Sequence, residues 1–364
     1  MSQRVNPELK EDLLKYGVKD WNDCFHCGTC TATCNLTDES FAFPRKEIKY
    51  LQMGLKNKVA QSVEPWLCYY CGDCSEQCLR EAEPGELMMS LRRYLMSLYD
   101  WTGISGLFYR NKLVYILSFF IVGIAIMLVA FSTKYDINEW KSTFEFGHLL
   151  EQLFVAGVAL FIILPSVFRM YWFAIVKDKT IKVSFIAYIT SLWELFLHSV
   201  TQKNILKCSN STFTWFRHWI VAVSYIVMLV MVVVFDWFQF ADGSGAGAII
   251  GQIIAYLVFG LLTIFSGIMI IKRISKKEEQ YKFSELSDWF FPIWLFLLAL
   301  TATLSFLTRQ LGIVNVAQLI FILHIIIIAQ WALLIVPFTK WAHILYRPFG
   351  IYFACLKKSS KPVK

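Results

Sequence analysis

Hydrophobic and polar positions divide the chain into two unequal parts. Residues 1–100 are rich in charged side chains, whereas residues 111–345 consist mainly of long apolar runs. An apolar run of about 20 residues is long enough to cross a bilayer as a helix. We expect six such spans, which we place at about 112–132, 148–175, 216–238, 247–271, 289–308 and 313–338.

A seventh apolar stretch, residues 181–200, is interrupted by Lys182 and Glu194. If it crossed the membrane, the basic segment 272–277 would fall on the outer side, although Lys and Arg prefer cytoplasmic loops. We therefore predict an amphipathic helix on the inner face for this stretch. Six spans then leave both ends of the chain in the cytoplasm, on a multi-pass protein of the cytoplasmic membrane.

Composition and charge also favour a membrane protein. The hydrophobic fraction is 57% and the charged fraction 17%, which is more apolar than a soluble protein of this length. The net charge of +8 comes largely from Lys and Arg in loops and tails that flank the apolar runs. This distribution is typical of membrane topology, so we exclude nucleic acid as a partner. The first twenty residues hold no apolar core of the signal-peptide type.

Eight of the ten cysteines form two copies of one pattern, C-x2-C-x2-C-x3-C. Bacterial-type ferredoxins hold two [4Fe–4S] clusters with this spacing, and the fourth cysteine of each copy binds the other cluster. Two ligand sets follow from that rule. The first cysteine set is Cys24, Cys27, Cys30 and Cys78, and the second cysteine set is Cys34, Cys68, Cys71 and Cys74.

Zinc and disulfides are the alternatives for these cysteines. Structural zinc uses four ligands in paired C-x2-C units, which is a different pattern. Disulfides need an oxidising compartment, and the expected topology places this part of the chain in the cytoplasm. Cys208 and Cys355 lie outside the pattern, and we expect them to be ordinary packing residues.

Histidines on or near the spans are candidate ligands of haem. Ionisable groups are costly inside a membrane and are usually functional there, and two imidazoles from different helices can hold one haem iron. His218 and His343 match in depth, whereas the partner of His324 is left open between His148, His198 and Met228. The residues expected to bind haem are His198, His218, His324 and His343, the last three as ligands of the iron.

The expected fold class is all-α, with an α-helical ferredoxin-like domain followed by a six-span bundle. A first short helix begins near Pro7 and ends near Gly17, segment 43–65 predicts one or two more, and residues 85–100 predict an amphipathic helix. The expected units are a cytoplasmic domain for two clusters at 1–100, a linker at 101–110, a transmembrane cytochrome b domain at 111–345 and a basic cytoplasmic tail at 346–364.

Longer motifs resemble known families. The cysteine copies, together with WLCYYCGDCSEQC and FPRK, resemble the C subunit of heterodisulfide reductases. The cytochrome b subunit of that system and the gamma subunit of respiratory nitrate reductase resemble the segments ELFLHSVTQKNILKC, FRHW and LHIIIIAQWALLIVPFTKWAHILYRP. A chain that joins both halves is similar to the C subunit of the quinone-interacting membrane-bound oxidoreductases.

This resemblance implies an electron-transfer component of a respiratory complex in sulfur metabolism, as in sulfate respiration. It implies two b haems and menaquinone as further cofactors, and soluble flavin and iron–sulfur subunits similar to heterodisulfide reductase A as partners. Electrons would pass between menaquinone and adenylylsulfate reductase. The alternatives are the membrane electron donor of a heterodisulfide reductase-type complex and a non-redox membrane sensor. Catalytic residues, the quinone site and the direction of electron flow are left open by the sequence.

Overall fold

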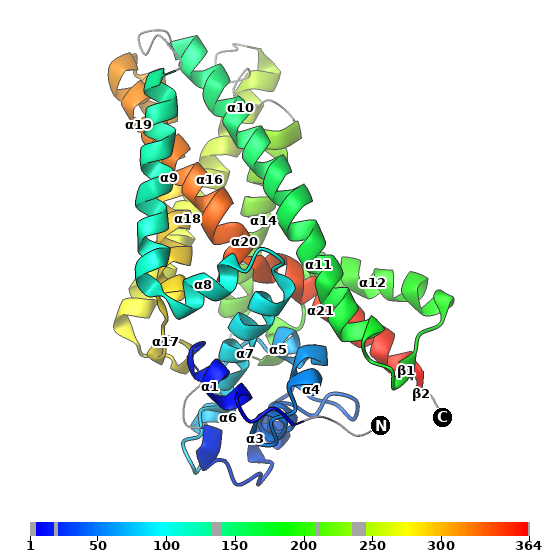
Figure 1. The fold of residues 1–364 in the computed structure, drawn as a ribbon. Helices are drawn as coiled ribbons and strands as arrows, with labels where there is room; N and C mark the ends of the chain where they lie inside the picture. The colour runs from blue at the N-terminus through cyan, green and yellow to red at the C-terminus, as the bar shows by residue number, and fades with distance from the viewer. Residues whose placement is uncertain (1–4, 18–20, 133–139, 209–211, 235–244, 363–364) are drawn as a thin grey trace.

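The structure is 78% helical with almost no strands, which confirms the predicted all-α class. Figure 1 shows a bundle of long helices standing on a smaller group of short helices. Within the part of the chain that is described, the strands are β1 (Ile181–Lys182) and β2 (Lys361–Pro362), which pair antiparallel. The computed structural model describes residues 5–17, 21–132, 140–208, 212–234 and 245–362.

The cysteine-bearing part of the chain folds as short helices packed on one longer helix. Pro84 begins that longer helix, because its fixed φ suits the first helical turn. The predicted apolar face is buried, with Leu87, Leu91 and Leu95 at most 1% exposed. Segment 43–65 holds two short helices, as predicted, and a third begins at its end, at Glu64. The helices are α1 (Leu9–Leu14), η1 (Trp21–Asp23), α2 (Thr29–Thr33), α3 (Arg45–Gln52), α4 (Lys56–Gln61), α5 (Glu64–Leu67), α6 (Asp73–Glu76) and α7 (Pro84–Tyr99).

Among the described residues, six helices are long and apolar enough to cross a membrane, which is the predicted number. Two of them are continuous spans assembled from α-helical and π-helical segments. The spans are α9 (Lys112–Ser132); α10 (Trp140–Val158) with η2 (Ala159–Ile163), α11 (Leu164–Tyr171) and η3 (Trp172–Val176); α14 (Thr212–Val234); α16 (Ala246–Ser275); α18 (Leu286–Gln310); and α19 (Val314–Gln330) with η4 (Trp331–Ile335) and α20 (Val336–Phe338).

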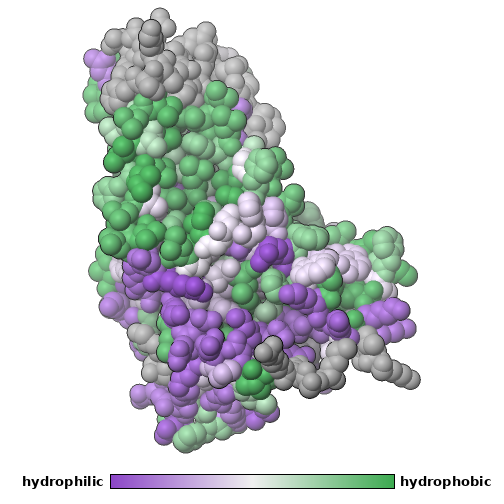
Figure 2. Space-filling view, viewed as in Figure 1, coloured by the Kyte–Doolittle hydropathy of each residue, from purple (hydrophilic) through white to green (hydrophobic). Residues whose placement is uncertain are grey.

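Apolar side chains cover the outside of this bundle. Figure 2 shows a continuous hydrophobic surface over the long helices and a largely hydrophilic one over the short helices. Leu128, Phe161 and Leu319, from three different spans, are each more than half exposed. Apolar surface on this scale is stable only against lipid, so the chain is a multi-pass membrane protein.

The remaining described helices connect the two parts, join successive spans or, for the last two, follow the final span. They are α8 (Ile104–Arg110), α12 (Phe185–Thr201), α13 (Ile205–Cys208), α17 (Glu279–Lys282), η5 (Lys340–Ala342) and α21 (His343–Lys358). Helix α12 occupies the stretch predicted to be amphipathic and is not among the six spans. Phe185 and Trp193 on one face are exposed, whereas Ala187 and His198 on the other face are buried, and α12 packs on α21. In Figure 1, α12 extends sideways from the bundle beside α21.

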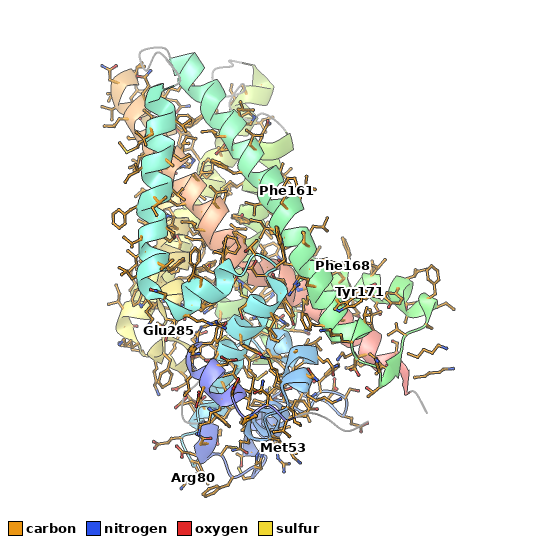
Figure 3. All side chains as sticks on the ribbon, viewed as in Figure 1. Met53, Arg80, Phe161, Phe168, Tyr171 and Glu285 are labelled. Atoms are coloured by element: carbon orange, nitrogen blue, oxygen red, sulfur yellow. The ribbon has the colours of Figure 1, made fainter. Side chains whose placement is uncertain are left out.

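Two polar contacts fix the end of α7 against the second span. Proline has no N–H, and its ring displaces the carbonyl four residues earlier. For Pro165 that carbonyl belongs to Phe161, and the indole N–H of Trp101 donates to it at 2.8 Å. The guanidinium of Arg169, one turn further on, donates to the carbonyl of Leu98 at 2.8 Å. Phe161 is labelled in Figure 3, on the long helix beside the entry to the bundle.

A glycine allows α21 to pack closely on α5 in the cysteine-bearing part. A Cβ atom on Gly350 would lie 2.6 Å from the Cβ of Trp66, a separation that real Cβ contacts essentially never show. The clash is with the Cβ of Trp66, which is fixed to the backbone of α5 and cannot rotate away as the far end of a flexible side chain could. Any larger residue at position 350 would therefore push α21 away from α5.

We predict that Gly350→Ala destabilises the protein by about 1–3 kcal/mol, the usual cost of overpacking. Gly260→Ala is the matched control, because Gly260 is also helical but nothing lies within 4 Å of its added Cβ. Alanine there should leave stability unchanged or raise it by up to about 1 kcal/mol, since glycine lowers helix stability. Thermal unfolding in detergent, followed by circular dichroism, measures both. Equal unfolding midpoints for the two variants would contradict the close packing of α21 on α5.

Candidate functional site

The two cysteine loops have the same backbone conformation. His26 and Tyr70, which occupy equivalent positions, have φ of 58° and 57°. The glycine two residues later has φ of 92° at Gly28 and 100° at Gly72, a region that favours glycine. Each glycine directly precedes a short helix, α2 or α6. The duplicated sequence pattern is therefore a duplicated structure.

In each loop, a backbone N–H points at the sulfur of the first cysteine. The amide of His26 donates to Cys24 Sγ at 3.4 Å, and the amide of Tyr70 donates to Cys68 Sγ at 3.3 Å. Hydrogen bonds to cluster sulfurs are among the factors that set the potential of iron–sulfur centres. Both loops thus place an N–H donor at the sulfur of their first cysteine.

The second cysteine set surrounds one cavity. Cys34, Cys68, Cys71 and Cys74 all line a space of about 360 Å³ that is partly open to solvent. Cys34 comes from the first sequence copy and the other three from the second, so the structure brings together the four residues of the predicted exchange. Burial and the repulsion from Cys68 and Cys71 raise the pKa of the Cys34 thiol to about 11.

The first cysteine set lies nearer the surface. Burial, together with smaller contributions from the nearby Cys24, Cys27 and Cys78, raises the pKa of the Cys30 thiol to about 11. Cys27 is exposed, whereas Cys30 is buried. As in the second set, three cysteines of one copy meet the last cysteine of the other. Neighbouring thiolates repel one another, so a bound cation is needed to keep such a group deprotonated.

The spacing of these thiols suits a cluster better than a single ion. Within the described residues, no three His, Cys, Asp or Glu side chains close tightly enough to hold one metal ion. A [4Fe–4S] cluster is larger, and its four thiolates stand further apart than the ligands of one zinc ion. The cavity lined by four cysteines therefore fits a cluster.

Cys208 is buried, as expected of a packing residue, and the structure adds what it packs against. It is not remote from the cysteine pattern, because it lines the same cavity as the second cysteine set and is 6% exposed. Its side chain lies close enough to that of Cys71 for each thiol to shift the pKa of the other. Cys208 reaches this cavity through the tertiary fold, because α13, which ends at Cys208, packs back from the membrane part onto the second cysteine loop.

Four helices of the membrane part that lie outside its spans converge on the second cysteine loop. Each touches a different position of that loop. His198 of α12 contacts Tyr69, Cys208 of α13 contacts Cys71, the side chain of Glu279 of α17 fills the space above Gly72, and Arg347 of α21 donates to the carbonyl of Cys68.

Two of the predicted histidines approach each other at this end of the bundle. The ring centres of His218 and His343 are 6.3 Å apart, with an angle of 62° between the planes. The Nδ1 atoms are occupied: that of His218 contacts Gln202 Oε1 at 2.5 Å and that of His343 contacts the carbonyl of Lys340 at 2.7 Å. In a neutral imidazole with Nδ1–H so engaged, Nε2 keeps a lone pair for a metal.

The other histidines have different surroundings. His324 is 5% exposed within the bundle, and its Nδ1 contacts Thr301 Oγ1 at 2.7 Å. His148 contacts Gln152 at 2.9 Å, and Gly147 beside it packs so closely that an added Cβ would lie 2.8 Å from Ile325, the neighbour of His324. The helices of His148 and His324 are therefore adjacent.

His198 is directed at the cysteine loop. Its Nε2 is 2.9 Å from the hydroxyl of Tyr69. Burial and the nearby Arg347 lower the pKa of His198 to about 4, so the ring is neutral near pH 7 and its Nε2 can accept a hydrogen bond from the Tyr69 hydroxyl. Met228, another possible ligand in the sequence, packs at the edge of the bundle core.

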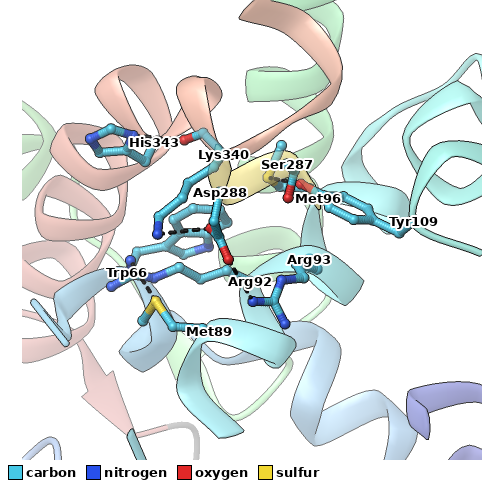
Figure 4. Close-up of a pocket in the computed structure, with 10 residues that line it drawn as sticks. All are labelled: Trp66, Met89, Arg92, Arg93, Met96, Tyr109, Ser287, Asp288, Lys340 and His343. Atoms are coloured by element: carbon cyan, nitrogen blue, oxygen red, sulfur yellow. Dashed lines mark hydrogen bonds and ion pairs between the residues drawn. The ribbon is translucent and has the colours of Figure 1, made fainter. Parts of the chain in front are cut away.

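A group of buried ion pairs joins α7 to the bundle. Asp288, near the start of α18, accepts from Arg93 at 3.3 Å and from Lys340 at 2.9 Å. Arg93 also binds Glu86 at 3.0 Å. Arg93 and Lys340 thus both bind Asp288 in a buried site, and Figure 4 shows Asp288 between Lys340 and Arg93.

The matches to known proteins described next each cover about a third of the chain or less. A protein of Archaeoglobus profundus, described as similar to the C subunit of heterodisulfide reductase, is 31% identical over 104 residues, which are 27% of this chain and 55% of that protein. The second iron–sulfur C subunit of the CoB–CoM heterodisulfide reductase of Methanocaldococcus jannaschii is 30% identical over 118 residues, 32% of this chain and 61% of that protein. The corresponding C subunit of Methanopyrus kandleri is 34% identical over 80 residues, 22% of this chain and 40% of that protein.

These iron–sulfur proteins are homologues of the chain. They support an electron-transfer role as an oxidoreductase component, and [4Fe–4S] clusters as cofactors. The chain spans about half the length of the relatives that it matches. No family model matches the chain. No solved structure matches it.

Sequence reasoning missed four residues that the structure places at the second cysteine set. These are Cys208, Tyr69, Arg92 and Arg347. Two signals were available. Cys208 is an additional cysteine just before the third span, and Arg92 is a cation within an otherwise apolar helix face. For Arg347, one helical turn after His343, only the tertiary contact reveals the role.

We predict that Cys71→Ala removes about four iron atoms per chain, because it deletes a ligand of one [4Fe–4S] cluster. Cys208→Ala is the matched control from the same cavity. It should leave the iron content unchanged, because four other cysteines already line the cavity. Iron and acid-labile sulfide in the purified proteins measure this. An equal loss in both variants would show that Cys208 is itself a ligand.

Proposed function

We propose that the chain is the membrane subunit of a quinone-linked electron-transfer complex, in which haem b in the bundle and two [4Fe–4S] clusters connect a membrane quinone with soluble partner subunits. The observation that carries this proposal is the contact between the two candidate centres. Arg347 lies on the same helix as His343, one turn later, and donates to the carbonyl of Cys68 at 3.1 Å.

The arrangement of the cysteine sets supports a relay with two ends. The second set faces the membrane part through His198, Cys208 and Arg347. The first set lies at the opposite end, where Phe25 and Leu79 are 71% and 97% exposed. Figure 3 places Arg80, whose guanidinium lies 4.3 Å from the Phe25 ring centre, at the end farthest from the long helices. A soluble partner would meet the first set there.

The residues present fit one haem between His218 and His343. Two imidazoles that bind one iron from opposite sides have ring centres about 6 Å apart, because each metal–nitrogen bond is about 2 Å long. The observed separation is 6.3 Å, and the occupied Nδ1 atoms hold both rings with Nε2 available. When bound, haem iron would exchange single electrons, and the protein would set its potential through these ligands and their burial.

His324 is the proposed ligand of a second haem within the bundle. Thr301 fixes its Nδ1, so its Nε2 is available in the same way. The packing of Gly147 against Ile325 favours His148 over His198 as its partner, since His198 is directed at Tyr69. We propose His148 with His324 for this reason.

Menaquinone and the identity of the partners rest on the resemblance of the sequence motifs. The similarity to the quinone-interacting oxidoreductases implies menaquinone in the membrane, soluble flavin and iron–sulfur subunits, and adenylylsulfate reductase beyond them. The cytoplasmic placement of the cysteine-bearing part rests on the positive charges of the connecting loops. The homologues are themselves subunits of larger complexes, which supports soluble partners.

The names of the homologues give a second candidate function. Relatives from methanogenic archaea are subunits of CoB–CoM heterodisulfide reductases. In that role, this chain would supply electrons to a partner that reduces a disulfide. The proteins that copurify with the full-length chain distinguish the two: a flavin subunit alone favours the first proposal, and a cysteine-rich catalytic subunit favours the second.

We predict that His218→Ala and His343→Ala each remove the same haem. Each variant should retain about half of the haem b of the parent protein, and the double variant should lose no more, because one iron needs both ligands. His26→Ala is the control, since His26 lies in the first cysteine loop. Haem per chain and the reduced-minus-oxidised spectrum measure the effect.

Two results would overturn parts of this proposal. Additive losses in the double variant would mean that His218 and His343 serve different haems. A parent protein purified from its native host without haem b absorbance would remove the haem relay as a whole.

A further inference from the structure

Two buried arginines adjoin the second cysteine set. Arg92 of α7 is 7% exposed and Arg347 of α21 is 8% exposed. Both donate to the carbonyl of Cys68, and each also donates to a second backbone carbonyl, Arg92 to Pro65 at 2.6 Å and Arg347 to Trp66 at 3.3 Å. One arginine comes from the cysteine-bearing part and the other from the end of the membrane part.

Neither arginine has a carboxylate partner among the described residues. Their contacts are backbone carbonyls, the sulfur of Met89 for Arg92 and the ring of Tyr69 for Arg347. The neighbouring cations Arg93 and Lys340 are different, because both bind Asp288. The boundary between the cysteine-bearing part and the membrane part therefore holds two buried positive charges that no described carboxylate balances.

Unbalanced buried charges are costly unless an opposite charge is nearby. A [4Fe–4S] core with four thiolates is a dianion when oxidised and a trianion when reduced. The cavity lined by the second cysteine set is the nearest place for that charge, because Cys68 belongs both to the cavity and to the contacts of the two arginines. Two positive charges match the charge of the oxidised cluster.

The charges of the two arginines also affect how readily the second cluster is reduced. Adding an electron increases the negative charge, which burial disfavours and neighbouring cations favour. The first cysteine set has no such pair among the described residues, since Arg45 and Arg80 near it are both exposed. Exposed cations are screened by water and salt and have a smaller effect.

We propose that Arg92 and Arg347 together form the counter-charge of the second [4Fe–4S] cluster and hold its reduction potential up against the effect of burial. Both are positioning residues, because they touch the Cys68 backbone and the surrounding protein and not the iron. The proposal rests on the proposed clusters. It explains how the second cluster, which would accept electrons next to His343, can be reduced although it is buried.

The test is a redox titration of the full-length protein in detergent, followed by EPR. Arg347→Gln should lower the potential of one cluster, so that its reduced-to-oxidised ratio at a fixed potential falls at least tenfold, which is about 59 mV for one electron. Arg92→Gln should shift the same cluster in the same direction. Arg347→Lys, which keeps the charge, should restore most of the parental ratio.

Two controls identify the cluster and the cause. Cys27→Ser changes a ligand of the first cysteine set and so marks its EPR signal, which should not be the one that Arg347→Gln shifts. Arg80→Gln removes an exposed cation beside the first cysteine loop and should shift neither cluster by a comparable amount.

The outcomes separate this inference from the proposed function. Iron and sulfide contents near zero in the parent protein would remove the clusters and with them the proposed function. With two clusters present, unchanged potentials in both Arg92→Gln and Arg347→Gln, or a shift of the first cluster alone, would overturn the counter-charge. If one glutamine variant fails to assemble, the other and Arg347→Lys still decide the question.

Discussion

The carbonyl of Cys68 receives hydrogen bonds from both parts of the chain, and the arrangement of the candidate centres depends on this meeting point. Arg92 reaches it from α7, and Arg347 reaches it from α21, one turn after His343. The contacts of the loop with α12, α13 and α17 surround the same point. A soluble iron–sulfur module joined to a bundle by residues 101–110 alone could adopt many orientations. Here the second cysteine loop is held at the end of the bundle by contacts that are far apart in the sequence.

The two cysteine loops have one backbone conformation but different environments. Matching φ values at Gly28 and Gly72 show that the local structure is set by the repeated sequence. The neighbours of each loop come from the tertiary fold, which leaves Cys27 exposed and packs Cys68 against buried arginines. Two chemically similar ligand sets can therefore differ in potential without a change of ligand, because charge, hydrogen bonding and solvent exposure all contribute.

Local patterns in the sequence predicted much of the fold. The six spans follow from apolar run length alone, and the exchange of Cys34 between copies follows from ferredoxin spacing. Depth along the spans was enough to pair His218 with His343, whose rings meet. The position of Cys208 beside the second cysteine set was not predicted, because it depends on how a connecting helix folds back onto a distant loop. Long-range contacts of that kind leave no periodic signal in one sequence.

Spin relaxation of the two clusters tests the central claim most directly, namely that the second cysteine set is the one beside the His218–His343 pair. Paramagnetic haem iron speeds the relaxation of a nearby cluster, and the effect falls steeply with distance. In the full-length protein, the account predicts faster relaxation of the second cluster when the haem is oxidised, with the first cluster much less affected. Equal relaxation of both clusters in the two haem states, or a larger effect on the first cluster, would contradict it.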